Sequence, residues 1–125
     1  MRYLGIDYGK KRIGLAFGEK GLVAPLLVCP NNKNIFDSIK EVCSDEAIDL
    51  VVLGFSQDLK EEVNLFAKKL KEHLALPIVF QNEALTTKEA ADKMLVSQTR
   101  RKDRKGRIDA VAAAQILAAY FADNR

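Results

Sequence analysis

The chain has 125 residues, of which 48% are hydrophobic and 30% charged, and its formal net charge at pH 7 is +3. This composition is typical of a soluble globular protein and excludes disordered, collagenous and fibrous classes. No apolar run approaches the roughly 18 residues that would cross a bilayer, and the apolar stretch before Asp7 is too short for a signal peptide. We therefore expect a cytosolic protein with a single domain over residues 1–125.

Two cysteines and one histidine leave little room for thiol or imidazole chemistry. Cys29 and Cys43 form no Cys-x-x-Cys pair, and we expect both as reduced, buried or half-buried thiols. His73 falls late in an amphipathic helical pattern among lysines and glutamates, which predicts a surface position. A catalytic triad and a histidine-rich metal site are therefore disfavoured.

The N-terminal segment predicts an antiparallel meander of three strands. Residues 2–7 and 12–17 are β-rich runs joined by a glycine-containing turn, which is a hairpin signal. Residues 22–29 form a third run after a second turn. Pro25 lies within this run and indicates an edge strand, because proline donates no hydrogen bond to a ladder.

The remainder of the chain alternates between helical and strand patterns. Asn34 is the expected N-cap of the first helix, Asp58 and Glu61 have capping-pair spacing, and Thr86 and Glu89 have capping-box spacing. Two buried strands are predicted at 50–54 and 77–80, and helices at 35–42, 58–74, 86–95 and 108–121.

Strands that alternate with helices require parallel pairing and right-handed crossovers. We therefore predict an α/β fold with a mixed five-stranded sheet. Its first three strands are antiparallel, its last two are parallel, and helices cover both faces. The first strand pairs with the meander on one side and with the parallel strands on the other.

Three acidic residues occupy positions that suit a ligand site. Asp7 ends an apolar strand in the middle of the predicted sheet, where an uncompensated carboxylate is costly. Glu83 follows the strand at 77–80, at the edge where open α/β sheets bind ligands. Asp109 begins the last helix on its alanine-rich face. Each also has an ordinary interpretation, as a turn residue, a loop acid and a helix N-terminal acid respectively.

Carboxylates gathered at one edge repel one another unless they are protonated or neutralised by cations. Oxygen ligands without histidine or cysteine suit Mg²⁺ or Mn²⁺. Two such ions would clamp an in-line displacement at a phosphodiester. The convergence of Asp7, Glu83 and Asp109 is a hypothesis drawn from the topology, since sequence spacing alone does not establish it.

A basic segment at 100–107 holds six cationic side chains against one acid, Asp103. Such a segment on an otherwise near-neutral chain favours a polyanionic partner, and the alternative is a solvated charged loop. Lys11 and Arg12 could add phosphate contacts or could be ordinary turn residues. The candidate nucleic-acid-binding residues of the basic segment are Arg100, Arg101, Lys102, Arg104, Lys105 and Arg107.

Three motifs resemble those of the YqgF/RuvX family, described as Holliday-junction-resolvase-like proteins and as nucleases that mature the 5′ end of 16S ribosomal RNA. The first motif lies at 4–9 with 11–16, the second at 83–87 and the third at 108–117. The first is long and rather specific, and the other two occur in the right order. The resemblance spans residues 2–121.

The resemblance implies a ribonuclease H-like fold in which Asp7, Glu83 and Asp109 are catalytic and hold Mg²⁺ or Mn²⁺. It implies a metal-dependent nuclease acting on structured nucleic acid, with precursor ribosomal RNA favoured and the ribosome as a further partner. The alternative substrate is a DNA junction, whose symmetry would call for a homodimer. Asn82 and Ala84 depart from the family pattern, which has aspartate and arginine there.

Two other functions stay open at this point. A binding module that keeps the fold without catalysis is favoured by the alanine at position 84. A nucleotide phosphotransferase is suggested because residues 5–9 also resemble the phosphate loop of actin-like and sugar-kinase ATPases. Those proteins clamp ATP between two domains, whereas this chain supplies one.

Overall fold

The computed structural model describes the backbone of residues 1–83 and 104–124, and the side chains of the second range from Ala110 onward. Within these ranges no helix is both long and apolar enough to span a membrane. In chain order the elements are β1 (Arg2–Asp7), β2 (Arg12–Glu19), β3 (Leu22–Pro30), α1 (Ile35–Asp45), β4 (Leu50–Phe55), the 3₁₀ turn η1 (Gln57–Leu59), α2 (Lys60–His73), β5 (Ile78–Asn82) and α4 (Arg104–Asp123).

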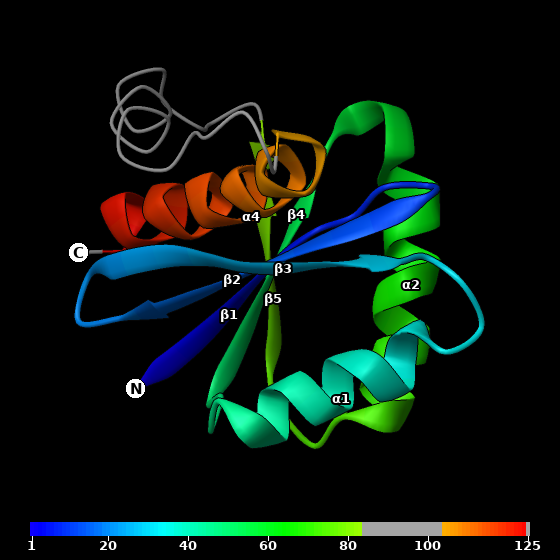
Figure 1. The fold of residues 1–125 in the computed structure, drawn as a ribbon, viewed down its shortest axis with the longest axis horizontal. Helices are drawn as coiled ribbons and strands as arrows, with labels where there is room; N and C mark the ends of the chain where they lie inside the picture. The colour runs from blue at the N-terminus through cyan, green and yellow to red at the C-terminus, as the bar shows by residue number, and fades with distance from the viewer. Residues whose placement is uncertain (84–103, 125) are drawn as a thin grey trace.

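The described strands form one sheet in the order β3-β2-β1-β4-β5. β1 pairs antiparallel with β2, and β2 pairs antiparallel with β3. β4 runs parallel to β1 and to β5. The predicted mixed sheet is therefore confirmed, with the first strand at its centre and the proline-containing strand at one edge (Figure 1).

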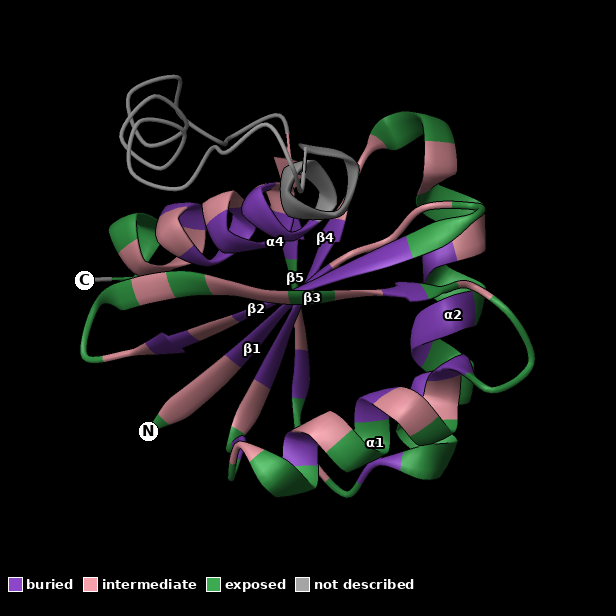
Figure 2. Ribbon diagram, in the orientation of Figure 1, coloured by how far each residue is buried: buried purple, intermediate pink, exposed green. Residues whose placement is uncertain are grey.

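Helices cover both faces of this sheet, with α1 and α2 on one side and α4 on the other (Figure 1). Side chains alternate along β1, so Leu4 and Ile6 are fully buried in the core beneath α1 and α2. The opposite face packs a smaller core in which Val52 of β4 meets the alanine-rich face of α4. Figure 2 shows buried positions along the strands and on the sides of the helices that face the sheet.

Two glycines let α4 approach the sheet closely. A Cβ atom at Gly5 would lie 2.7 Å from the backbone oxygen of Ala113 and 2.6 Å from Cγ of Leu117. A Cβ atom at Gly54 would collide with the side chain of Ile116. Because these strand positions carry no side chain, the helix backbone lies close to β1 at Gly5 and the side chain of Ile116 fills the space over β4 at Gly54.

Arg2 stabilises the end of the sheet where β1 begins. Its guanidinium makes a 2.7 Å ion pair with Glu19 of β2 and donates a 2.6 Å hydrogen bond to the backbone oxygen of Glu46 after α1. The same guanidinium lies 4.4 Å from the ring centroid of Phe17. These contacts join β1, β2 and the end of α1.

Three predictions about individual elements were wrong in detail. β5 was expected as a buried strand, but it is an edge strand and Phe80 is 44% exposed. The helix expected from Asp58 begins at Lys60 after the turn η1, and no side chain caps it. The last helix begins at Arg104 rather than Ile108, so part of the basic segment is helical instead of looped.

The remaining local predictions are mostly confirmed. Asn34 is the N-cap residue of α1, although its side chain makes no capping hydrogen bond. Cys29 and Cys43 are free and buried, and His73 is exposed at the end of α2. The helix expected at 86–95 lies outside the described residues.

Candidate active site

Asp7 is the last residue of the central strand β1 and is half-buried. It stands in register with Gly14 of β2 and Gly54 of β4. Gly5 faces α4, and side chains two residues apart on a strand share a face. The carboxylate of Asp7 therefore lies on the α4 side of the sheet, at the carboxyl end of β1.

Glu83 directly follows β5 and is also half-buried. Gln81 of β5 pairs with Gly54, which in turn pairs with Asp7, so these three positions form one row across the parallel strands. Glu83 lies two residues beyond that row. The carboxyl ends of β1, β4 and β5 meet at one edge, and the structure brings Asp7 and Glu83 to this edge.

Asp109 belongs to α4, and its side chain lies outside the described part of the structure. The direction of the helix still fixes where its backbone lies. Ala113 sits over Gly5, whereas Phe121 sits over Gly18, which pairs with Tyr3 near the start of β1. The helix thus runs opposite to β1 (Figure 1). Asp109 is one turn before Ala113, so its backbone lies toward the end of β1 that carries Asp7.

The donor chemistry at this edge consists of carboxylate oxygens. Cys29 and Cys43 are packed in the core on the other face of the sheet, and burial raises the pKa of both thiols. His73 is the last residue of α2 and stacks on Phe36, with 5.0 Å between ring centroids. Among the side chains that the structure describes, no three potential metal ligands cluster. The side chain of Asp109 lies outside that described part. An oxygen-only donor set suits a hard divalent cation.

The expected nucleic-acid-binding residues fall into three groups. Lys11 and Arg12 are exposed in the turn after β1 and at the first position of β2. Arg104, Lys105 and Arg107 belong to the first two turns of α4, and their side chains are not described. The others, Arg100, Arg101 and Lys102, lie outside the described residues.

Of the two departures from the family motif, one can be placed. Asn82 is the last residue of β5, is half-buried and has an interaction partner. Ala84 lies outside the described residues. The first acid of the second motif is thus replaced by an amide within the strand, directly before Glu83.

Comparisons with known proteins agree with the geometry. A family model described as "RuvX: Holliday junction resolvase" matches residues 1–123. A relative from Syntrophomonas wolfei is 34% identical, with 97% of this chain and 94% of the relative covered. One from Chlamydia pneumoniae is 36% identical, with 95% and 88% covered. Both are named "Putative pre-16S rRNA nuclease".

Solved structures identify the fold. Thermus thermophilus RuvC bound to a Holliday junction superposes with a TM-score of 0.70 at 16% identity, covering 99% of this chain and 96% of the other. The fowlpox virus Holliday junction resolvase gives a TM-score of 0.64 at 12% identity, covering 100% of both chains. At such identities the likeness establishes architecture alone, and it confirms the expected ribonuclease H-like fold.

Proposed function

We propose that this chain, which belongs to the RuvX family and is a nuclease, cleaves structured RNA at the 5′ end of precursor 16S ribosomal RNA. The observation that carries the proposal is the shared carboxyl edge of β1, β4 and β5, where Asp7 and Glu83 lie. The names of the curated relatives support the RNA substrate. The basic composition of the segment at 100–107 is consistent with a polyanionic substrate.

In this proposal Asp7, Glu83 and Asp109 hold two divalent cations, Mg²⁺ or Mn²⁺. Their donor set fits such ions because it offers hard oxygens and no sulfur or imidazole. Bound at this edge, the cations would supply Lewis-acid stabilisation and a water of lowered pKa for in-line attack. The half-buried positions of Asp7 and Glu83 limit water access and strengthen their electrostatic effect.

The role of the chain's cations is to hold the phosphate backbone. Lys11 and Arg12 follow Asp7 closely, and both are exposed. Residues 104–107 lead into Asp109 along the first turn of α4. Phosphates held on both sides of the acids would align the scissile bond without contributing sequence specificity.

A DNA four-way junction is the second candidate substrate. It is favoured by the description of the family model and by the likeness in fold to a resolvase bound to a junction. Cleaving both arms of a symmetric junction needs two copies of the site, so this candidate also requires a homodimer.

The test is cleavage of an end-labelled precursor rRNA leader and of a labelled four-way junction, with Mg²⁺ or Mn²⁺, by the wild type and Asp7→Asn. We expect cleavage of the rRNA to fall by about a hundredfold or more in Asp7→Asn, by analogy with loss of one preorganised electrostatic group. Chelation of the metal should abolish it in the wild type. Circular dichroism would verify that the variant is folded.

Asp45→Asn is the matched control, since Asp45 is exposed at the end of α1, near the end of the sheet where β1 begins. It should cleave like the wild type. Undiminished cleavage by Asp7→Asn would contradict the assigned site. Binding of both nucleic acids without cleavage of either would identify a binding module, and cleavage of the junction alone would select the second candidate.

A further inference from the structure

A groove of about 350 Å³ lies on the face of the sheet covered by α1 and α2, beside the end of β1. It is lined by the residue after Asp7, by the loop between β3 and α1 with the start of α1, and by α2 from Glu62 to Lys69. Its volume is at the lower end of the range for small-molecule sites. The lining residues that carry the argument are Tyr8, Lys33, Phe36, Glu62, Phe66 and Lys69.

The aromatic side chains in this groove form a braced platform. Phe66 is 5% exposed, and its ring centroid lies 5.1 Å from that of Tyr8 and 5.3 Å from that of Phe36. Tyr8 and Phe36 are only half-buried. Phe66 supports both rings, and the imidazole of His73 stacks on one face of Phe36 with 5.0 Å between ring centroids. The rest of the Phe36 ring and the ring of Tyr8 line the groove. Aromatic rings of this kind are sequence-tolerant stacking surfaces for nucleobases.

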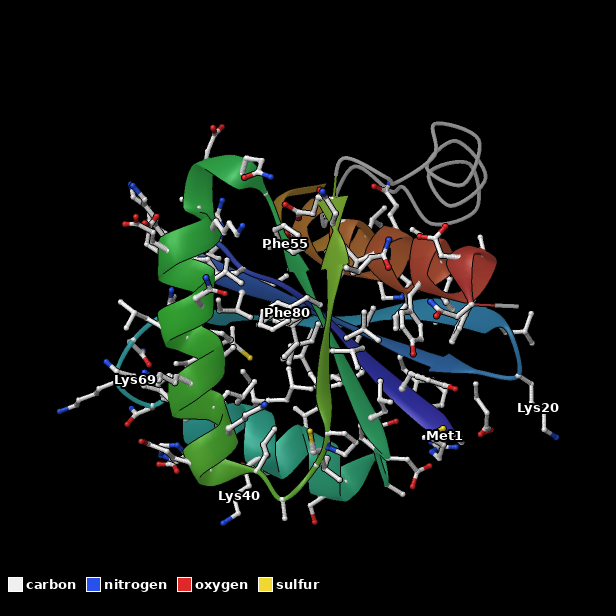
Figure 3. All side chains as sticks on the ribbon, turned by 180° about the vertical axis from the view of Figure 1, so that it is seen from behind. Met1, Lys20, Lys40, Phe55, Lys69 and Phe80 are labelled. Atoms are coloured by element: carbon white, nitrogen blue, oxygen red, sulfur yellow. The ribbon has the colours of Figure 1, made fainter. Side chains whose placement is uncertain are left out.

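Charges around the rings match a nucleotide. Lys33 and Lys69 are exposed at the groove, and Lys69 projects from α2 (Figure 3). Either ammonium group can pair with a phosphate. Glu62 is half-buried and lines the same groove. Its carboxylate can accept a hydrogen bond from the exocyclic amino group of a base. A purely apolar ligand would use none of these three charges.

Two hydrogen bonds connect the loop that borders the groove to the turn that follows Asp7. The amide nitrogen Nδ2 of Asn31 donates to the backbone oxygen of Gly9 at 2.8 Å, and the backbone N–H of Asn31 donates to the oxygen of Lys11 at 2.9 Å. These bonds fasten the turn after Asp7 to the loop that borders the groove. Tyr8 follows Asp7 directly, so the groove and the acids lie on opposite faces of one sheet edge.

From this arrangement we propose that the groove binds an unpaired base of the nucleic-acid substrate, on the strand whose phosphate reaches Asp7. The inference rests on the proposed function and extends it, since it assigns preference for a single-stranded nucleotide next to the cleavage point. A strand that crosses the carboxyl edge presents its phosphate to one face and its base to the other. Pairing would hide the base, so duplex nucleic acid gains nothing from the groove.

The experiment uses the full chain carrying Asp7→Asn, so that binding is measured without cleavage. Single-stranded RNA with 2-aminopurine at successive positions reports stacking by its fluorescence, and anisotropy reports affinity. Phe36→Leu, added to this background, should abolish the fluorescence change at one position and weaken binding about five- to a hundredfold. Phe80→Leu removes an exposed phenylalanine outside the groove and should change neither.

A second pair of variants guards against misfolding of Phe36→Leu. Lys69→Gln should weaken single-strand binding and reduce the slope of log affinity against log salt by about 0.7. Lys68→Gln, on the same helix but outside the groove lining, should leave that slope unchanged. Duplex RNA should bind all variants equally.

The proposal is overturned if both Phe36→Leu and Lys69→Gln match their controls in fluorescence and affinity. It is also overturned if duplex RNA loses as much affinity as single-stranded RNA. These outcomes are separate from a failure of the proposed function, which appears as absent cleavage by the wild type. If the wild type does not cleave but the fluorescence still shows stacking at one position, the groove proposal stands and the nuclease assignment fails.

Discussion

Cys43 shows how burial at one residue changes its chemistry. The side chain is 6% exposed within the core beneath α1, and burial raises the pKa of its thiol to about 11 from an ordinary value of 9.0. Burial likewise raises the pKa of Cys29. Nearly all of the Cys43 thiol is therefore protonated near neutral pH, which makes it a poor nucleophile and a poor metal ligand.

The raised pKa of Cys43 predicts a loss of stability at alkaline pH. The unfolded thiol releases its proton above pH 9, whereas the folded thiol keeps it until about pH 11. Its contribution to stability is thus complete below pH 9 and declines as the pH rises through 11. Between pH 8 and 11 the free energy of unfolding should fall by about 2 kcal/mol more in the wild type than in Cys43→Ala. Urea denaturation at several pH values measures this, and parallel pH profiles would refute it.

At the residue scale, the acids were more predictable than the groove. Asp7 and Glu83 were predicted at one edge because acids at the ends of apolar strands violate the local pattern, and their positions there are confirmed. Their role as metal ligands stays a prediction. Tyr8, Phe36 and Phe66 violate no local pattern, since Tyr8 is an ordinary turn residue and the two phenylalanines are ordinary helix positions. Only the fold reveals that two of them stay half open beside exposed lysines.

At the scale of elements, the position of Asp109 depends on how closely α4 packs on β1. Gly5→Ala should disturb this packing, because the added Cβ would lie 2.7 Å from the backbone oxygen of Ala113. A backbone atom in a helix cannot move alone, so α4 must shift. We expect the free energy of unfolding to fall by about 1–3 kcal/mol, with a loss of cleavage activity, since Asp109 would move relative to Asp7.

Gly18→Ala is the matched control for this prediction. Gly18 also sits in a strand facing α4, but an added Cβ there would first meet Cζ of Phe121 at 2.9 Å. The end of a side chain can rotate away, so the cost should be smaller than at Gly5 and activity should persist. Denaturant unfolding and the rRNA cleavage assay measure both effects. Equal destabilisation by the two variants would show that helix–strand contact at Gly5 is not special.

The elements themselves were largely readable from periodicity. The switch from alternating to helical spacing after the meander predicted the parallel strands and their place on the far side of β1 from the meander. The errors concern ends and edges. Phe80 reads as buried, yet β5 has no neighbour beyond it in the described sheet. The ring of Phe80 packs loosely against Phe55, with 6.2 Å between ring centroids. Exposure of an edge strand depends on what lies beside it, which local sequence does not encode.

At the scale of the whole molecule, the two faces of the sheet divide the proposed work. The α4 face carries the acids, and the face under α1 and α2 carries the groove. Both features meet at the carboxyl edge of the parallel strands, where such folds bind ligands. At the opposite end of β1, the contacts of Arg2 join β1 to β2 and to the residue after α1.

If phosphate contacts are made by the start of α4, the position of charge should matter more than its total. Lys105→Gln combined with Arg107→Gln lowers the formal net charge from +3 to +1, and so does Lys20→Gln combined with Lys40→Gln. Lys20 lies in the β2–β3 turn and Lys40 on α1, away from the tips of β4 and β5 (Figure 3).

The first pair should weaken binding of single-stranded RNA and reduce the slope of log affinity against log salt by about 1.4, because two phosphate contacts are lost. The second pair should leave the slope close to that of the wild type, since distant exposed charges are screened beyond about 10 Å at 0.1 M salt. Anisotropy titrations between low and moderate salt distinguish the two. Equal slopes in both double variants would mean that binding follows net charge, and that the basic start of α4 does not contact the substrate.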